Sequence, residues 1–137
     1  GLTAGSDYRA RVDFRWYDAN GDTQRRRRLT SKTCALAELL PNLRVSSITG
    51  VPAGATEQYS VSVTNAGEMD SPESGLRLGV DGKAPRFAPV PGLAPGETAT
   101  VGLSGPRCVY RVRATADPGL QIPESRETDN SLFHGCP

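Results

Sequence analysis

Three cysteines and one histidine are the residues of this 137-residue chain that are best suited to covalent or metal chemistry. Cys34, Cys108 and Cys136 lie far apart, none belongs to a C-x-x-C pair, and His134 supplies the only imidazole. Structural zinc sites draw their ligands from closely spaced Cys and His pairs, so this spacing disfavours zinc and favours one disulfide with a third thiol left over. No nucleophile or acidic residue forms a recognisable catalytic motif with His134. We therefore predict that the chain is not an enzyme.

A second set of residues suited to chemistry is acidic and lies near the end of the chain: Asp117, Glu124, Glu127 and Asp129. Calcium prefers several oxygen ligands in a flexible loop, which makes these four side chains calcium candidates, although their spacing matches no defined calcium loop. The alternative is that the carboxylates are solvated and accept hydrogen bonds from the backbone of a crossing loop. Apart from this calcium candidate, we expect no cofactor.

Four consecutive arginines, Arg25–Arg28, follow the turn sequence DANGD of residues 18–22. Tight binding of a polyanion needs positive charge gathered on one surface, whereas arginines on a strand alternate between two faces. The formal net charge of the chain is only +1, and we expect no nucleic-acid partner. The acids of the turn resemble the start of a calcium loop, but Gly21 stands at its fourth position rather than its sixth. The Asn-Gly pair is instead a strong hairpin signal.

The strand before this turn carries an apolar stripe. Tyr8, Val12, Phe14 and Trp16 alternate with charged residues, which predicts a half-buried strand and a β-hairpin over residues 1–35. A two-stranded hairpin alone is marginal in water, so we interpret the stripe as an interaction surface. Its partner is the following domain, a preceding domain or another subunit reached by strand addition. We favour the final hairpin of an upstream β-domain and keep an assembly arm as the alternative.

From Pro41 onward, short strand-like runs alternate with turn signals. The runs cover residues 42–48, 57–64, 76–80, 97–103, 108–116 and 130–136, without any helical period. Six or seven short strands in this length predict an antiparallel β-sandwich. No apolar run approaches the ~20 residues of a membrane-spanning helix, and we expect no membrane insertion. Residues 36–40 are the predicted linker between the hairpin and this sandwich.

Alternation along the strands assigns residues to the two faces of each sheet. It places four rows inward: Tyr59, Val61 and Val63; Ala99, Val101 and Leu103; Cys108, Tyr110, Val112 and Ala114; and Leu132, His134 and Cys136. Since the last two rows lie on strands expected to be neighbours, we predict a Cys108–Cys136 disulfide. Closing a loop of about 28 residues contributes roughly 3 to 4 kcal/mol. Cys34 is then unpaired or bonded to another chain, and His134 is expected to be a packed, hydrogen-bonded histidine.

Several short motifs of the second part occur in a recognisable order. They are PNLRV at 41–45, NAG at 65–67, DGK at 81–83, LAPGE at 93–97 and a Glu-x-x-Glu-x-x-Asn pattern ending at Asn130. Residues 41–137 resemble the CARDB family, the cell-adhesion-related domains found in bacterial surface and secreted proteins. Asp129 departs from the pair of asparagines usual in the family, and the cysteine pair is found only in some members. The resemblance implies an immunoglobulin-like β-sandwich, often in tandem copies, with adhesive or accessory roles.

The sequence thus predicts an all-β chain: an immunoglobulin-like antiparallel β-sandwich with an additional N-terminal β-hairpin. We interpret it as a non-enzymatic module for adhesion, spacing or protein–protein interaction, located extracellularly or at a bacterial cell surface, as disulfides indicate. The expected partner is protein, either a preceding domain or further copies of the chain. One alternative is a subunit of an extracellular fibre assembled through residues 1–35. Another is a carbohydrate-binding module of a secreted enzyme, for which Phe133, Tyr17 and Phe87 are the candidate outward rings.

Overall fold

The computed structural model describes residues 7–17, 20–21, 24–30, 34–35 and 39–137 of the chain. All regular elements of these residues are β-strands, joined in antiparallel sheets, which confirms the predicted fold class. The chain divides into two compact units, residues 1–38 and residues 39–137. Within the described residues, no helix has the length and apolarity that a membrane span requires.

The first unit contains two short antiparallel ladders. Strand β2 (Arg11–Tyr17) pairs with β3 (Gln24–Thr30), and β1 (Asp7–Tyr8) pairs with β4 (Cys34–Ala35). The connection between β2 and β3 contains Asn20 and Gly21, as the Asn-Gly signal predicts. Gly21 has a φ of +75°, a conformation that costs glycine little because it lacks a Cβ.

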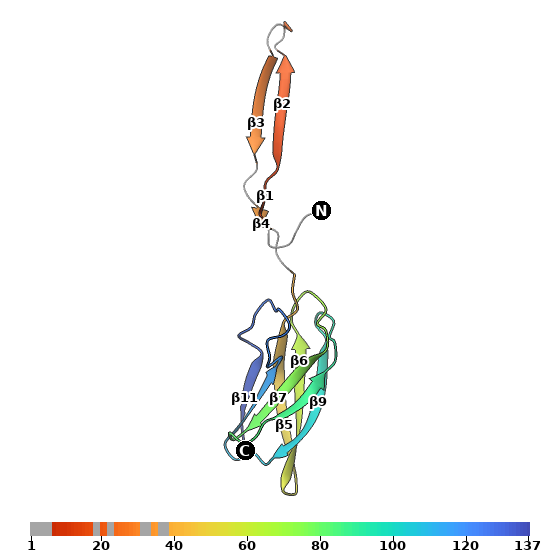
Figure 1. The fold of residues 1–137 in the computed structure, drawn as a ribbon, viewed down its shortest axis with the longest axis vertical. Helices are drawn as coiled ribbons and strands as arrows, with labels where there is room; N and C mark the ends of the chain where they lie inside the picture. Colours follow the sequence, from red (N-terminus) through yellow and green to blue (C-terminus); the bar gives the residue numbers. More distant parts are fainter. Residues whose placement is uncertain (1–6, 18–19, 22–23, 31–33, 36–38) are drawn as a thin grey trace. The chain divides into compact units, whose positions relative to one another are not determined.

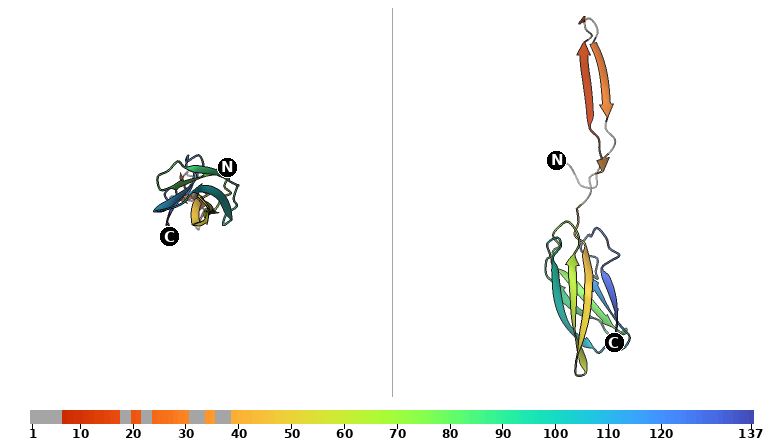
Figure 2. Two further views of the ribbon diagram at one scale, coloured as in Figure 1. Left: turned by 90° about the horizontal axis from the view of Figure 1, so that it is seen from below. Right: turned by 180° about the vertical axis from the view of Figure 1, so that it is seen from behind.

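The second unit is a sandwich of two sheets (Figures 1 and 2). One sheet has the order β5-β6-β9, with β5 (Leu43–Ala53), β6 (Thr56–Asn65) and β9 (Thr98–Pro106). The other has the order β11-β10-β7-β8, with β7 (Ser74–Val80), β8 (Arg86–Val90), β10 (Arg111–Ala116) and β11 (Ser131–Gly135). All the pairings are antiparallel, as in immunoglobulin-like sandwiches.

The core lies between the two sheets and is built by the alternation along their strands. Tyr59, Val61 and Val63 are fully buried, as predicted, and share one core cluster with Leu76, Leu78 and Val80 of β7. Two residues of the predicted inward rows are exposed. Tyr110 is 79% exposed because β10 begins only at Arg111, so strand alternation does not yet apply to it. His134 stands opposite the buried Val112 and so lies on the predicted face, but near the end of the edge strand β11 it is exposed rather than packed.

Strand β8 lies at an edge of its sheet and was not among the six strand-like runs predicted. Its sequence, RFAPV, contains Pro89, which lacks the N–H that a central strand must donate. An edge position tolerates this loss. The same rule accounts for Pro52 in β5, the edge strand of the other sheet.

The loops at one end of the sandwich are organised by Asn65. Its amide donates to the carbonyls of Met69 and Leu93, and its Oδ1 accepts the N–H groups of Asn42 and Gly67. Gly67 must be a glycine here, because a Cβ would stand 2.5 Å from the backbone of residues 40–42. Through these four hydrogen bonds the Asn65 side chain satisfies backbone groups of the turn that follows β6.

Candidate functional site

The apolar stripe occupies one face of the hairpin. Register places Val12 opposite Leu29 and Phe14 opposite Arg27, and residues opposite each other share a face. Val12, Phe14, Trp16 and Leu29 are 44–50% exposed. Among the described residues, the apolar face of the hairpin is therefore uncovered, although the sequence predicts a half-buried strand. The side chain of Tyr8 is outside the described part of the structure, and the interaction role of the stripe stays a prediction.

The opposite face of the hairpin is charged and centred on one acid. Asp13 accepts a hydrogen bond from Arg28 Nε at 2.9 Å and forms ion pairs with Arg11 and Arg26 at 3.4 and 3.6 Å. The hydrogen bond from Arg28 is the main cause that lowers the pKa of Asp13. Such exposed pairs stabilise little. The arginine run is nevertheless divided between the two faces of the hairpin. Arg26 and Arg28 contact Asp13, whereas Arg27 stands opposite Phe14 on the apolar face.

A disulfide joins Cys108 to Cys136, the pair indicated by strand parity, with 5.7 Å between their Cα atoms. Beside it, the buried carboxylate of Glu57 accepts the N–H of Cys108 at 3.0 Å. The Tyr59 hydroxyl donates to the carbonyl of Pro106 at 2.6 Å. Burial and the Glu57 carboxylate raise the pKa of Tyr59 to about 12. These contacts attach the segment before β10 to the core.

Cys34 lies in β4, and its side chain is outside the described part of the structure. The 137 residues contain three cysteines, two of which form the disulfide. The chain therefore offers Cys34 no cysteine of its own as a partner, and a bond to another chain stays a prediction.

The acid with the most perturbed ionisation in the C-terminal loop is Glu124. It is 8% exposed, and its carboxylate accepts hydrogen bonds from the N–H of Leu43 and, at 2.7 Å, from Asn130 Nδ2. Burial raises the pKa of Glu124 to about 7, with smaller contributions from the charges of Glu127 and Asp117, although the two hydrogen bonds oppose the shift. Glu124 thereby ties the loop before β11 to the start of β5.

The other three acids of this loop also accept hydrogen bonds from nitrogen donors. Asp117 accepts the N–H of Ile122 at 2.9 Å, Glu127 that of Glu124 at 3.1 Å, and Asp129 the side-chain amide of Asn42 at 3.2 Å. Asp117 and Glu127 thus accept backbone N–H groups of the loop, as in the alternative interpretation, whereas Asp129 accepts from a side chain outside the loop. In the described residues, the one close group of three Cys, His or acidic side chains is Asp81 with Cys108 and Cys136, whose sulfurs are bonded to each other. Calcium binding at the loop stays a prediction.

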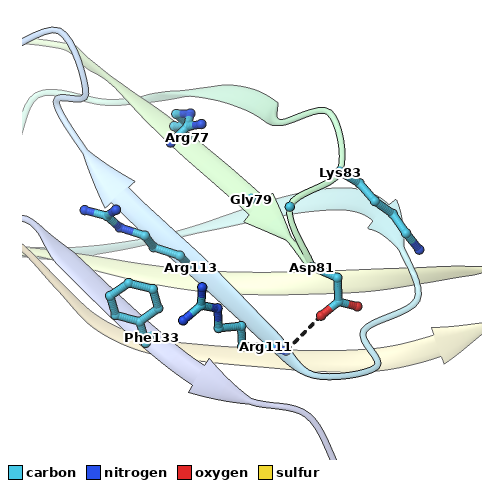
Figure 3. Close-up of a pocket in the computed structure, with 8 residues that line it drawn as sticks. Arg77, Gly79, Asp81, Lys83, Arg111, Arg113 and Phe133 are labelled. Atoms are coloured by element: carbon cyan, nitrogen blue, oxygen red, sulfur yellow. Dashed lines mark hydrogen bonds between the residues drawn. The ribbon is translucent and has the colours of Figure 1, made fainter.

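The outward face of the four-stranded sheet holds a site that the sequence did not reveal (Figure 3). Arg113 of β10 stands opposite Phe133 of β11 on one side and Gly79 of β7 on the other. Arg111 and Arg77 lie on the same face, and a pocket of about 240 Å³ opens among these residues. Arg111 and Arg113 alternate with Val112 and Ala114 of a predicted inward row, so alternation alone puts them outward. Only the order of the strands brings them together with Arg77, and no local pattern predicts that order.

This face, which we name the arginine face, consists of Arg77, Gly79, Arg111, Arg113 and Phe133. The guanidinium carbons of Arg111 and Arg113 lie 5.6 and 5.1 Å from the centre of the Phe133 ring. Arg113 also donates to the Ser131 hydroxyl at 3.1 Å. Cation–π contacts and a hydrogen bond of this kind fix the orientation of long, otherwise mobile side chains.

Comparison with known proteins gives a family and a fold. The family model named CARDB matches residues 40–133, as the motif order predicted. The chain is similar to the CARDB domain of the PF1109 protein from Pyrococcus furiosus, solved as a crystal structure in complex with di-metal ions. Identity is 23%, with 72% of this chain and 94% of that chain covered and a TM-score of 0.61. A solution structure of the same domain gives 24% identity, the same coverage and a TM-score of 0.59. No curated protein matches the chain.

Proposed function

Because the chain belongs to the CARDB family through residues 40–133, we propose that it is a non-enzymatic interaction module of an extracellular or cell-surface protein whose hairpin binds another protein. The observation that carries the proposal is the exposed apolar face of the hairpin. Val12, Phe14, Trp16 and Leu29 form one continuous strip on a two-stranded ladder. Contiguous exposed apolar surface of this kind marks binding surfaces in soluble proteins.

The disulfide supports an extracellular location. The Cys108–Cys136 bond closes the end of a sandwich of fewer than 100 residues, and such bonds persist in oxidising compartments. A domain of this size buries a limited core and gains a large share of its net stability from a disulfide. A disulfide-stabilised sandwich is suited to hold an interaction surface in a stable fold outside the cell.

The distribution of charge supports a second copy of the chain as the partner. Residues 1–38 contain eight basic and five acidic side chains, whereas residues 39–137 contain eight basic and ten acidic ones. The formal charges of the two units are therefore +3 and −2. A hairpin that binds the sandwich of another copy brings opposite charges together, and opposite potentials speed and orient association. Repeated head-to-tail contacts of this kind build a fibre, while a two-fold contact stops at a dimer.

The experiment uses Trp16, the only tryptophan of the chain. Its emission shifts to the blue when the stripe is covered, so emission and sedimentation are measured together as the protein concentration rises. We expect the blue shift and the appearance of larger species to coincide, and both to weaken as salt is added.

The Phe14→Ser variant keeps the fluorescent probe and removes the centre of the stripe, and is expected to stay monomeric. Val51→Ser is the matched control, because Val51 is a similarly exposed apolar side chain on the sandwich. It is expected to associate like the unmodified chain. A monomer with unshifted emission at every concentration contradicts the second copy as partner, and equal effects of the two substitutions contradict the hairpin as the surface.

A further inference from the structure

The arginine face concentrates positive charge on a unit that is negative overall. Arg77, Arg111 and Arg113 all project outward between buried core residues, and no outward strand position of this sheet is acidic. Residues 39–137 as a whole have a formal charge of −2. The three guanidinium groups are thus a local feature, separate from any general positive field.

The positive charges of the face are not neutralised by ion pairs. Within the described residues, no carboxylate forms an ion pair with any of the three arginines. Asp81 lines the pocket, but its carboxylate accepts the N–H groups of Val109, Tyr110 and Arg111 at 2.7–2.9 Å. These hydrogen bonds lower the pKa of Asp81, and the bond from the Arg111 N–H has the largest effect. Its charge is therefore committed to the backbone of the turn before β10.

The hollow of the face comes from a missing side chain. Gly79 lies next to Arg113 across the ladder, and a Cβ built on Gly79 meets no atom within 4 Å. Gly79 lines the same pocket as Arg77, Arg111 and Arg113, whose side chains are drawn in Figure 3. The φ of Gly79 is outside the left-handed region, so the backbone does not require glycine here.

Two exposed aromatic rings flank the charges. Phe133 is 56% exposed beside Arg113, and Phe87, paired with Arg77 across β7 and β8, is 66% exposed. Both rings stand on the same face as the arginines, because residues opposite each other in a ladder point the same way. The face thus combines three cations, two of which are held over the Phe133 ring, with apolar ring surfaces and a hollow between them.

We propose that the arginine face binds the carboxylate or sulfate groups of an acidic polysaccharide. Guanidinium groups bind such planar or multi-oxygen anions through paired N–H donors, and the exposed rings offer apolar surface to the C–H faces of sugars. The hollow lies in the middle of a sheet, so a peptide cannot bind there by adding a strand at an edge. Nucleic acid suits the face less, because single strands bind along rows of aromatic side chains on which successive bases stack, whereas Phe133 and Phe87 stand on opposite edge strands with the arginines between them.

The test measures binding of the full chain to polygalacturonate, which carries carboxylates, and to dextran sulfate, with uncharged dextran and single-stranded DNA as comparisons. We expect binding to one or both acidic polysaccharides and none to dextran. The Arg77→Gln, Arg113→Gln double variant is expected to bind at least about tenfold more weakly, since charge-assisted hydrogen bonds each contribute on this scale. Gly79→Val fills the hollow without changing any charge and is expected to cause a similar loss.

Two controls separate this site from other sources of affinity. Arg44→Gln with Arg126→Gln removes the same charge from exposed positions elsewhere on the sandwich, and Arg15→Gln with Arg27→Gln removes it from the hairpin. Both are expected to bind within about twofold of the unmodified chain. Equal losses in either control overturn the proposal, as do binding to neither polysaccharide and equal binding to DNA. The hairpin variant Phe14→Ser is expected to bind normally, which keeps this result independent of the proposed protein contact.

Discussion

At the scale of single residues, Glu124 couples the folding of the sandwich to pH. Its carboxylate is buried between Leu43 and Asn130, two residues on separate segments of the chain. The pKa of about 7 in the folded state stands well above the ordinary value of 4.5. Between these two values the folded protein binds more protons than the unfolded chain, so its stability falls as pH rises.

We predict that the free energy of unfolding decreases by up to about 2 kcal/mol between about pH 5.5 and about pH 8, as measured by urea denaturation. The stabilisation that Glu124 contributes is complete below its pKa in the unfolded chain. It is lost as the pH rises through the pKa of Glu124 in the folded protein. Asp81, whose pKa is lowered, acts in the opposite direction and in a more acidic range. The two effects are therefore separable in one pH series.

Glu124→Gln tests the assignment of this pH dependence. Glutamine keeps the acceptor for Leu43 N–H, and its amide can donate to Asn130 Oδ1, which is buried without a partner in the described structure. The variant is expected to lose the slope and to exceed the unmodified protein in stability at high pH. Glu68→Gln, at an exposed position, is the matched control and is expected to keep the slope. An unchanged slope in Glu124→Gln would show that another group is responsible.

The chemistry of these residues could be predicted from the sequence better than their environment could. Asparagine is a residue type that satisfies turn backbone through its side-chain amide, and Asn65 does so through four hydrogen bonds. Glu124 was given two alternatives, a cation ligand or an acceptor for backbone N–H groups. Its burial depends on Leu43, which is 81 positions away, and contacts of that range leave no local pattern.

At the scale of elements, the disulfide is the strongest local constraint on the sandwich. Cys108 precedes β10 and Cys136 follows β11, so the bond locks the open ends of two paired strands. The closed loop spans 28 positions. Loop-closure entropy then stabilises the folded state by about 3 to 4 kcal/mol.

We predict that reduction lowers the thermal midpoint of the sandwich by more than about 10 °C, because about 1 kcal/mol shifts a domain of this size by several degrees. The measurement is circular dichroism with and without reductant, after the thiols have been counted. The Cys34→Ser variant is the control and is expected to show the same shift. An unchanged midpoint after complete reduction would assign the stability to the core alone.

Strands could be predicted from the sequence wherever one face of the strand is buried and the other is exposed. The β6 run alternates cleanly, and its inward row is fully buried. Strand β8 gave no such signal, since five residues containing Pro89 at a sheet edge show neither alternation nor a continuous apolar run. The arginine face was hidden for a related reason. It requires β7, β10 and β11 to be neighbours, although they are separated in sequence.

At the scale of the whole molecule, the two units differ in how they are stabilised. The buried core identified in the described residues lies entirely within residues 43–122. The hairpin is held by its ladder and by the exposed ion pairs of Asp13. Two-stranded ladders without a covered face are marginally stable, whereas a two-sheet sandwich with a shared core unfolds cooperatively.

We predict that the two units unfold in separate transitions. The emission of Trp16 reports the hairpin, and far-ultraviolet circular dichroism is dominated by the sandwich, so the two probes are expected to give different midpoints in a dilute sample. Residues 39–137 expressed alone are expected to reproduce the sandwich midpoint within a few degrees, because none of the core residues is lost.

If the partner of the stripe is a second copy, raising the protein concentration moves the midpoint of the hairpin transition toward that of the sandwich, since binding stabilises the state that binds. Coincident transitions in dilute solution would instead show that the hairpin and the sandwich of one chain fold as a single cooperative body.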